Sequence, residues 1–268
     1  MHGRVAATEW LTPGLVRVFL EGGDLAALQM PDATDAYLNA AFRPAGASYA
    51  EVFDPQVVRE RHPAGEQPAR RRYTVRAWDA RRARLSVDFV VHGDSGVAGP
   101  WAANASPGDV LVFTGPSGGY RPDAAADLHL MAGDESALPA IAASLEALPA
   151  GARAAVRVVV DGPEHEIPLD SRADVDLAWL HRHGDERDDS LLVAAVEALD
   201  LGGATPFCFV HGEADEIRAV RRHLLAERGL TRRDLSCSPY WRRTMSDEAW
   251  RQIKRDYVAA METESLGS

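Results

Sequence analysis

Cysteine is scarce in this chain, and long apolar segments are lacking. The two cysteines, Cys208 and Cys237, lie far apart and do not have the grouped spacing that zinc and iron–sulfur sites require. We therefore expect neither a structural metal nor a protein-bound cluster. The N-terminal sequence MHGRVAATEWLTPG has no apolar core of signal-peptide length, and no later segment is apolar for long enough to cross a bilayer. These features predict a cytoplasmic protein with reduced thiols and no membrane insertion.

Basic residues are fewer than acidic ones. The chain carries 29 lysines and arginines against 40 aspartates and glutamates, which gives a formal net charge of -11. An acidic surface repels polyanions, and this argues against nonspecific binding to nucleic acid or to anionic membranes. Any anionic ligand must therefore be captured by a local cluster of positive charge. With 268 residues, of which 46% are hydrophobic, the chain has the composition of a globular protein of about two domains.

The hydrophobic pattern changes once along the chain. Up to residue 122 it consists of short alternating segments such as LVRVFLEG, separated by Gly, Pro and Asp, which is typical of antiparallel strands that close into a small barrel. After Asp127 strand-like and helix-like segments alternate, and this indicates a mostly parallel sheet. The segment that begins at Ser246 has the pattern of a terminal helix. We predict an antiparallel Greek-key β-barrel domain over residues 1–122 and an α/β domain with a C-terminal helix over residues 123–268.

The segment RRRYTVRAWD gathers positive charge on a predicted strand. Because side chains alternate along a strand, Arg71 and Tyr73 lie on one face while Arg72 points away. An arginine fork can hold a pyrophosphate, an aromatic side chain can cover a flat ring, and the hydroxyl of Thr74 can hydrogen-bond the edge of that ring. Arg76 could add a second phosphate contact. A charged, exposed strand on which Tyr73 is merely packed explains the string equally well.

A glycine-rich segment, DFVVHGDSGVAGPWAANASPGDVL, starts on the next predicted strand. Its glycines at positions 93, 96 and 99 let the backbone approach a ligand. Amides near Ala98 to Ala102 could meet a phosphate at the start of a short helix that Trp101 would anchor. A strand-to-helix crossover that needs glycine for its geometry alone is the simpler explanation of this segment taken by itself. The later string GPSGGY is explained by a turn that leaves the barrel.

In the second half, MAGDESALPAI combines a strand end, a glycine turn and a helix start. Its backbone amides suit a dinucleotide phosphate, but Asp134 and Glu135 stand where GxGxxG would have glycines. Carboxylates beside a phosphate are unfavourable unless they point away, so the string alone is an ordinary strand-to-helix turn. Arg182, in WLHRHG, could pair with a 2′-phosphate and so favour NADPH over NADH. The neighbouring His181 and His183 lack a third ligand nearby in sequence and are better explained as solvated histidines.

The order of these strings resembles the siderophore-interacting protein family of ferric-siderophore reductases, which are ferredoxin-reductase-like flavoenzymes that use FAD and NADPH. The resemblance is carried by RRYTVR, DFVVHGDSGVAGPWAA, GPSGGY, AGDESALPAI, WLHR, FVHGEADEIRAVRRHL and YWRR. It extends from about Arg4 to Arg251. Flavoenzymes of this architecture hold the flavin on the barrel and the nicotinamide nucleotide on the sheet, and the resemblance implies the same division here.

The resemblance implies two sets of cofactor contacts. Those to FAD are Arg71, Tyr73, Thr74, Arg76, Asp88, Val90, His92, Gly93, Ala98, Gly99, Trp101 and Ala102. Those to the nicotinamide nucleotide are Gly133, Asp134, Glu135, Ser136, Arg182, Gly212, Glu213 and Ala214. The arginine-rich strand would then be a phosphate clamp beside a Tyr-Thr pair that faces the flavin.

The chain departs from the family pattern on the substrate side. Asn39, in DAYLNAAF, stands where related sequences often have lysine, and YWRR lacks the glycines that commonly flank it. An acidic protein must hold an anionic chelate locally. If the family arrangement holds, Arg121, Arg242 and Arg243 would therefore form a basic pocket at the flavin edge. Solvent exposure ahead of the terminal helix explains Arg243 equally well.

Together these features predict a monomeric flavoenzyme that uses NADPH, with NADH as a second candidate reductant, to reduce ferric siderophores and release Fe(II). Because the flavin carries the redox chemistry, we expect no side-chain catalytic residue and no metal ligand. Two alternatives remain open, a flavin reductase that serves a protein electron acceptor and a noncatalytic siderophore-binding protein. Saturable turnover of a small ferric chelate would exclude the first, and near-stoichiometric flavin in the purified protein would argue against the second.

Overall fold

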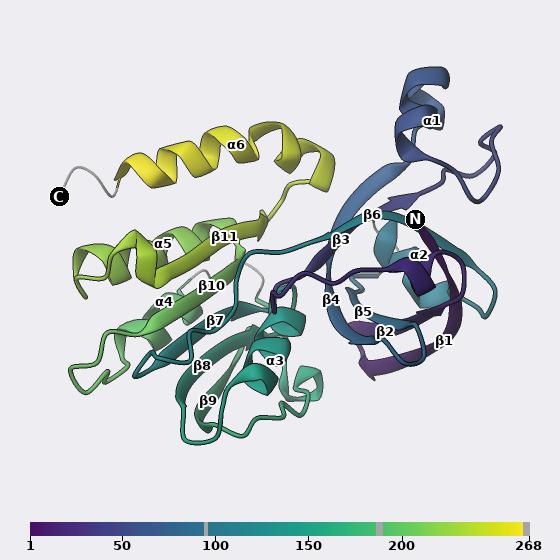
Figure 1. Ribbon diagram of the computed structural model, residues 1–268. Coiled ribbons are helices and arrows are strands. Elements are labelled where there is room, and N and C mark those ends of the chain that lie inside the picture. Colours follow the sequence, from purple (N-terminus) through teal and green to yellow (C-terminus); the bar gives the residue numbers. More distant parts are fainter. Residues whose placement is uncertain (94–95, 186–189, 265–268) are drawn as a thin grey trace. The chain divides into compact units, whose positions relative to one another are not determined.

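The computed structural model describes residues 1–93, 96–185 and 190–264. The chain divides into two compact units, Met1–Gly119 and Tyr120–Ser268 (Figure 1). The sequence pattern predicts a division after residue 122, close to the point where these units meet. Among the described residues, no helix is both long enough and apolar enough to span a bilayer.

The first unit is a closed antiparallel barrel (Figure 1). Its strands are β1 (His2–Thr12), β2 (Leu15–Glu21), β3 (Tyr37–Phe42), β4 (Ala69–Asp79), β5 (Arg84–Val90) and β6 (Val110–Ser117). They pair in the order β1-β2-β5-β4-β3-β6, and β6 closes the barrel because it pairs with both β1 and β3. Closure removes the unpaired edges that an open sheet would expose. The predicted antiparallel barrel is confirmed.

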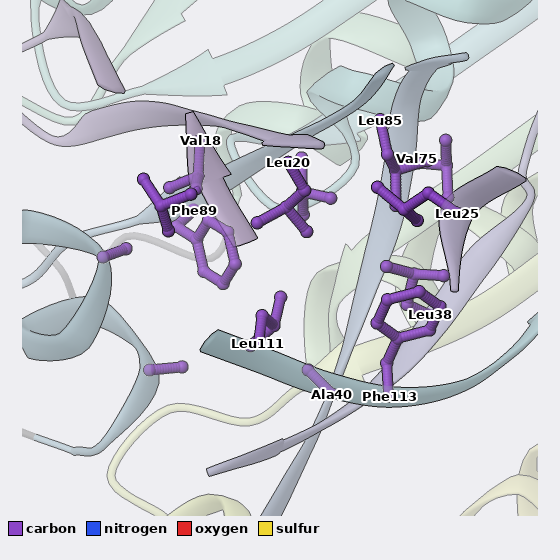
Figure 2. Packing of buried hydrophobic residues seen from close by; sticks show 14 of the residues in the cluster. Val18, Leu20, Leu25, Leu38, Ala40, Val75, Leu85, Phe89, Leu111 and Phe113 are labelled. Atoms are coloured by element: carbon purple, nitrogen blue, oxygen red, sulfur yellow. The ribbon is translucent and has the colours of Figure 1, made fainter. Parts of the chain in front are cut away.

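Alternating side chains fill the barrel interior. Leu85 and Phe89 of β5 point inward and meet Val18 and Leu20 of β2, and all four are fully buried (Figure 2). Phe113 of β6 is buried in the same cluster. Removing a side chain of this size from water contributes about 1.5–3 kcal/mol to stability. This core fixes the positions of β4 and β5, which carry half of the predicted flavin contacts.

Short elements connect the barrel strands. They are the helices α1 (Pro55–Arg61) and α2 (Ala98–Asn104) and the 3-10 turns η1 (Leu25–Ala27) and η2 (Ala64–Glu66). Strands β4 and β5 form a hairpin, with Asp79 opposite Arg84 at its end. Helix α1 lies in the long connection between β3 and β4, and the carboxylate of Asp54 caps it by accepting the backbone N–H of Gln56 at 2.7 Å.

The second unit is built on a five-stranded sheet in the part of the chain that the structure describes. Its strands are β7 (His129–Asp134), β8 (Arg153–Val160), β9 (Asp174–His181), β10 (Phe207–Glu213) and β11 (Leu235–Trp241). Its helices are α3 (Leu138–Ala147), α4 (Leu191–Glu197), α5 (Ala214–Ala226) and α6 (Asp247–Thr263), with 3-10 turns η3 (Pro163–His165) and η4 (Arg232–Asp234). The strand order is β11-β10-β7-β8-β9 and every pairing is parallel, as the alternating pattern predicts.

The helices of this unit bury the faces that their sequences predict. On α3, Leu138, Ile141 and Leu145 recur at helical spacing and are at most 1% exposed. Helices α4 and α5 contribute to one apolar cluster with β7, β8 and β10. Helix α6 packs Trp250 against Ala214 at the start of α5, and Ser246 caps its N-terminus as predicted.

The strand order places a switch point between β7 and β10. From β7 the chain moves outward through β8 and β9, and then returns to form β10 on the other side of β7. In open α/β sheets ligands bind at the carboxyl ends of strands at such a point. Here the two strands end with Gly133 and Asp134 on β7 and with Gly212 and Glu213 on β10.

Candidate functional site

The arginine-rich strand β4 presents two different faces. Tyr73 lies opposite Leu38 and Arg71 opposite Ala40, and both partners are buried in the barrel core. Arg72 is exposed on the other face, where it lies opposite Asn39. The predicted alternation, with Arg71 and Tyr73 on one face and Arg72 on the other, is therefore confirmed.

Thr74 and Arg76, the other two predicted FAD contacts on β4, follow Tyr73. Thr74 is buried, and it pairs with Tyr37 of β3. The pairing of β4 with β5 shifts register between Val75 and Ala77, which places the partly buried Arg76 at a β-bulge. Bulges often re-aim a side chain beside a functional site. The strict alternation of the pairing between β4 and β5 is therefore interrupted at Arg76.

A cluster of aromatic rings joins β4 to the short helix α2. The ring centroids of Tyr73 and Phe89 lie 4.2 Å apart. The ring centroid of Trp101 lies 5.6 Å from that of Phe89 and 5.5 Å from that of Phe42. Trp101 therefore anchors α2 on the barrel, as the sequence predicts. Tyr73 and Trp101 are only partly buried, so each ring retains surface that a flat ligand could cover.

Asp88 is held by a residue that sequence reasoning did not single out. Arg17, directly opposite on β2, donates from Nε to Asp88 Oδ1 at 2.7 Å and from Nη2 to Oδ2 at 2.8 Å. The Asp88 carboxylate is 1% exposed, so this two-pronged contact supplies the partner that a buried charge requires. Both Asp88 oxygens are thus already engaged within the barrel, and its assignment to FAD stays a prediction.

The glycines between β5 and α2 have two explanations. A Cβ at Gly99 would lie 3.2 Å from the carbonyl oxygen of Val90, so glycine there lets α2 approach the strand closely. This is the crossover geometry that was the simpler explanation of the segment. Gly93 and Gly96 both have positive φ, 55° and 80°, and a Cβ at either would meet nothing within 4 Å. Their backbone is therefore open to a ligand.

Four further predicted flavin contacts lie in the same segment. Ala98 and Ala102 are buried in the barrel core, so only their backbone groups are available to a ligand. Val90 and His92 are partly buried. The twelve predicted FAD residues thus lie on two adjacent strands, on the helix that follows them and in the connection between β5 and that helix.

In the second unit, two glycines allow β7 and β10 to meet tightly. A Cβ at Gly133 would lie 2.2 Å from the carbonyl oxygen of His211, and a Cβ at Gly212 would lie 2.7 Å from Asp134 Oδ2. Gly212 also has a φ of 148°. Any larger residue at Gly133 would push the two strands apart, so both glycines are required by the packing at the switch point.

The Asp134 carboxylate points into the protein and joins three strands. Its Oδ1 accepts hydrogen bonds from the backbone N–H and the hydroxyl of Ser136. Its Oδ2 accepts hydrogen bonds from the backbone N–H of Glu213 and from Trp241 Nε1, both at 2.8 Å. Burial, together with the neighbouring Glu135, raises the pKa of Asp134. These hydrogen bonds give the carboxylate a structural role, and its assignment to the nicotinamide nucleotide stays a prediction.

Glu135 and Arg182 neutralise each other. Arg182 donates from Nη1 and Nη2 to the two Glu135 oxygens at 2.7 and 2.6 Å, and both side chains are largely buried. A phosphate that reached Arg182 would have to compete with this bidentate pair. The assignment of Arg182 to a 2′-phosphate stays a prediction. The neighbouring His181 is a surface histidine whose Nε2 lies 2.8 Å from Glu166 Oε1.

Glu213 and Arg243 organise the start of α5. Glu213 is 1% exposed and accepts the backbone N–H groups of Asp215 and Glu216 at 2.7 and 3.0 Å, which caps the helix. The Arg243 guanidinium reaches Glu216 and also lies 3.7 Å from Glu213. Arg242 forms an ion pair with Asp215 at 3.3 Å.

Solvent exposure therefore does not explain Arg243, whose side chain is 16% exposed and paired with the buried Glu216, whereas Arg242 is partly exposed. Arg121 is exposed and belongs to the second unit as well. The assignment of these three arginines to the substrate stays a prediction.

Two profiles of known protein families cover the chain. Residues 4–120 match the siderophore-interacting FAD-binding domain, and residues 126–244 match the siderophore-interacting protein domain. The ferric vibriobactin reductase ViuB of Vibrio cholerae is 36% identical over 188 residues, which are 69% of this chain and 69% of ViuB. The chain belongs to the siderophore-interacting protein family. An uncharacterised protein of Mycobacterium tuberculosis is 38% identical over 96% of this chain and 95% of its own length.

Solved structures agree with this membership. The siderophore-interacting protein SipS from Aeromonas hydrophila has a TM-score of 0.82 at 27% identity and covers 97% of this chain and 98% of its own. A siderophore utilization protein from T. fusca has a TM-score of 0.80 at 36% identity, with 92% and 94% covered. The ferredoxin reductase of carbazole 1,9a-dioxygenase, at 16% identity and a TM-score of 0.60, covers 87% of this chain and 65% of its own. That last likeness shows the ferredoxin-reductase-like fold alone.

Three residues that position this siderophore-interacting protein's candidate sites were not found from the sequence. Arg17 holds Asp88, Trp241 holds Asp134, and Glu216 shares Arg243 with Glu213. Each contacts a residue that is distant in the sequence, and no local motif shows these contacts.

Proposed function

We propose that this siderophore-interacting protein is an FAD-dependent reductase that uses NADPH to reduce ferric siderophores and so release Fe(II). The observation that carries the proposal is the 36% identity with a ferric vibriobactin reductase, in a chain whose first 120 residues match an FAD-binding domain almost completely. Fe(II) binds oxygen ligands less tightly than Fe(III), so reduction loosens an oxygen-donor chelate.

The barrel residues fit FAD. Arg71 and Arg76 supply cationic donors in a protein of net charge -11, and the partly exposed Tyr73 can cover one face of a flat ring. Open backbone at Gly93 and Gly96 gives the phosphates room to approach. When bound, FAD supplies the conversion of a hydride into single electrons. The task of the protein residues is to bind the pyrophosphate and to orient the ring.

The carboxyl edge of β7 and β10 fits a nicotinamide nucleotide. The switch point is the usual ligand position in such a sheet, and Asp134 and Glu135 are both engaged by protein donors that reduce their repulsion of phosphate. NADPH is proposed over NADH because Arg182 lies at this edge. Its release from Glu135 would provide the guanidinium that a 2′-phosphate requires.

The test is a chemical assay with purified protein. FAD should co-purify or reconstitute near one per chain, and anaerobic addition of NADPH and a ferric siderophore should yield Fe(II), detected with an Fe(II)-specific chromophoric chelator. Omitting either NADPH or FAD should abolish Fe(II) formation. Protein that binds no FAD, or that binds FAD and NADPH but reduces no ferric chelate without an added carrier protein, would contradict the proposal.

A further inference from the structure

The start of α5 holds a buried cluster with more negative than positive charge. Asp134, Glu213 and Glu216 are each 1% exposed, and they come from β7, β10 and α5. Arg243, which follows β11, is the cation that contacts Glu213 and Glu216. The other nearby cation, Arg182, is already paired with Glu135. If every group were ionised, these three buried carboxylates and Glu135 would face two guanidinium groups, those of Arg243 and Arg182.

The three carboxylates differ in their hydrogen bonds. Each carboxylate oxygen of Asp134 accepts hydrogen bonds from two donors. Both oxygens of Glu213 are also engaged, by the helix N–H groups and by the backbone N–H of Arg243. Glu216 is different, because its Oε1 meets Arg243 while its buried Oε2 has no hydrogen-bond partner in the described structure.

An ionised carboxylate with an unsolvated oxygen is costly to bury, whereas a protonated one is much less so. The group with the fewest donors therefore takes a proton first. Burial, reinforced by the Asp134 carboxylate, raises the pKa of Glu216 to about 7, although Arg243 opposes this shift. Burial raises the pKa of Asp134 as well, but its four donors stabilise the ionised form, so the missing donor at Glu216 Oε2 is the observation that distinguishes Glu216.

We propose that Glu216 is the proton-binding residue of this edge, and that it takes up a proton when the phosphates of a nicotinamide nucleotide bind beside it. The proposal rests on the proposed nucleotide site. A phosphate adds negative charge near the cluster and competes with Glu216 for Arg243. Either effect leaves the ionised Glu216 without compensation, so binding favours its protonated form. Glu216 then acts as a positioning residue that controls how freely Arg243 can turn toward the ligand.

This coupling makes nucleotide affinity depend on pH. With Glu216 half protonated near pH 7 in the free protein, binding at that pH should take up about 0.5 proton. The nucleotide dissociation constant should rise about tenfold between pH 6 and pH 8, because above the pKa each binding event must first draw a proton from solution.

Titration calorimetry of the FAD-loaded protein measures this uptake. NADP⁺ is the probe because it cannot reduce the flavin, and titrations in buffers of different ionisation enthalpy give the number of protons exchanged. The matched variant is Glu216→Gln, which resembles the protonated residue in shape and charge. The control is Glu227→Gln on an exposed residue just after the same helix. Because NADP⁺ has a titrating phosphate of its own, the informative quantity is the difference between the parent and each variant.

The parent and Glu227→Gln should show equal proton uptake, whereas Glu216→Gln should lose about half a proton of it at pH 7. The ratio of the parent dissociation constant to that of Glu216→Gln should rise about tenfold between pH 6 and pH 8. Equal uptake in the parent and Glu216→Gln, with NADP⁺ bound to both, would overturn the role of Glu216 and leave the proposed function standing. Failure of NADP⁺ to bind the parent at pH 6 would overturn the nucleotide site itself, and this inference with it.

A second measurement tests the resting proton without any nucleotide. An unfolded Glu216 titrates near its ordinary pKa of 4.5, so the folded protein binds the extra proton between about pH 4.5 and pH 7. The parent should therefore lose stability relative to Glu216→Gln as pH rises through this window. A stability difference that does not change with pH would contradict a protonated Glu216.

Discussion

Replacing Asp134 with alanine tests whether this carboxylate stabilises the fold or contacts the ligand. The variant removes the acceptor that joins the end of β7 to β10 and β11. Two donors, Glu213 N and Trp241 Nε1, would lose their 2.8 Å partner. Each donor left unpaired in a buried site costs about 1–3 kcal/mol, so the free energy of unfolding should fall by about 2–6 kcal/mol. Ser136→Ala is the matched variant, since it removes one hydroxyl donor and leaves Asp134 with three, at a cost of about 1 kcal/mol.

Urea unfolding of the FAD-loaded protein, followed by tryptophan fluorescence and circular dichroism, measures the effect. Trp241 belongs to the affected network, so its transition should move to lower urea in Asp134→Ala. Flavin retention at low urea should not change, because the predicted FAD residues lie in the other unit. Refutation would be an Asp134→Ala protein that unfolds within 1 kcal/mol of the parent but binds NADP⁺ poorly. The carboxylate would then contact the ligand and would not be needed to hold the three strands together.

Three further substitutions address the predicted binding residues. Arg71→Ala should weaken FAD binding by about 1.5–3 kcal/mol, or about 10- to 100-fold, in a flavin fluorescence titration, while the exposed Arg72→Ala should have little effect; equal losses would refute the clamp. Glu135→Gln should release Arg182 and lower the KM for NADPH but not for NADH, and an unchanged ratio of the two KM values would show that Arg182 only supports the fold. Arg121→Ala should raise the half-saturating concentration of an anionic ferric siderophore and weaken its salt dependence, and identical kinetics at low and high salt would place the chelate elsewhere.

The order and type of the elements could be predicted because they depend on local patterns. The alternation of apolar residues in β2 and β5 predicts a half-buried antiparallel barrel, and Leu138, Ile141 and Leu145 predict the buried face of α3. The family, too, follows from motifs in a fixed order. In each case the information lies within a few residues of the element that it describes.

The partners within the candidate sites could not be predicted, because they depend on which distant strands become neighbours. No local pattern shows that Arg17 will face Asp88, because β2 and β5 are separated in the sequence and become neighbours only when the barrel forms. The same reason hides the contact of Trp241 with Asp134. Arg182 was judged available to a phosphate, and the structure instead gives it Glu135. Ion pairs of this kind can be identified only in the folded structure, where residues of opposite charge from distant parts of the sequence lie close together.

The most direct test of the central claim is an anaerobic stopped-flow experiment on the FAD-loaded protein, with NADPH and a ferric siderophore mixed in sequence. The account predicts that one equivalent of NADPH per flavin bleaches the visible absorbance band of the flavin, and that the ferric siderophore then restores it while Fe(II) accumulates at two ions per flavin. Persistent bleaching after the ferric siderophore is added, with restoration only when a redox carrier protein is supplied, would contradict it.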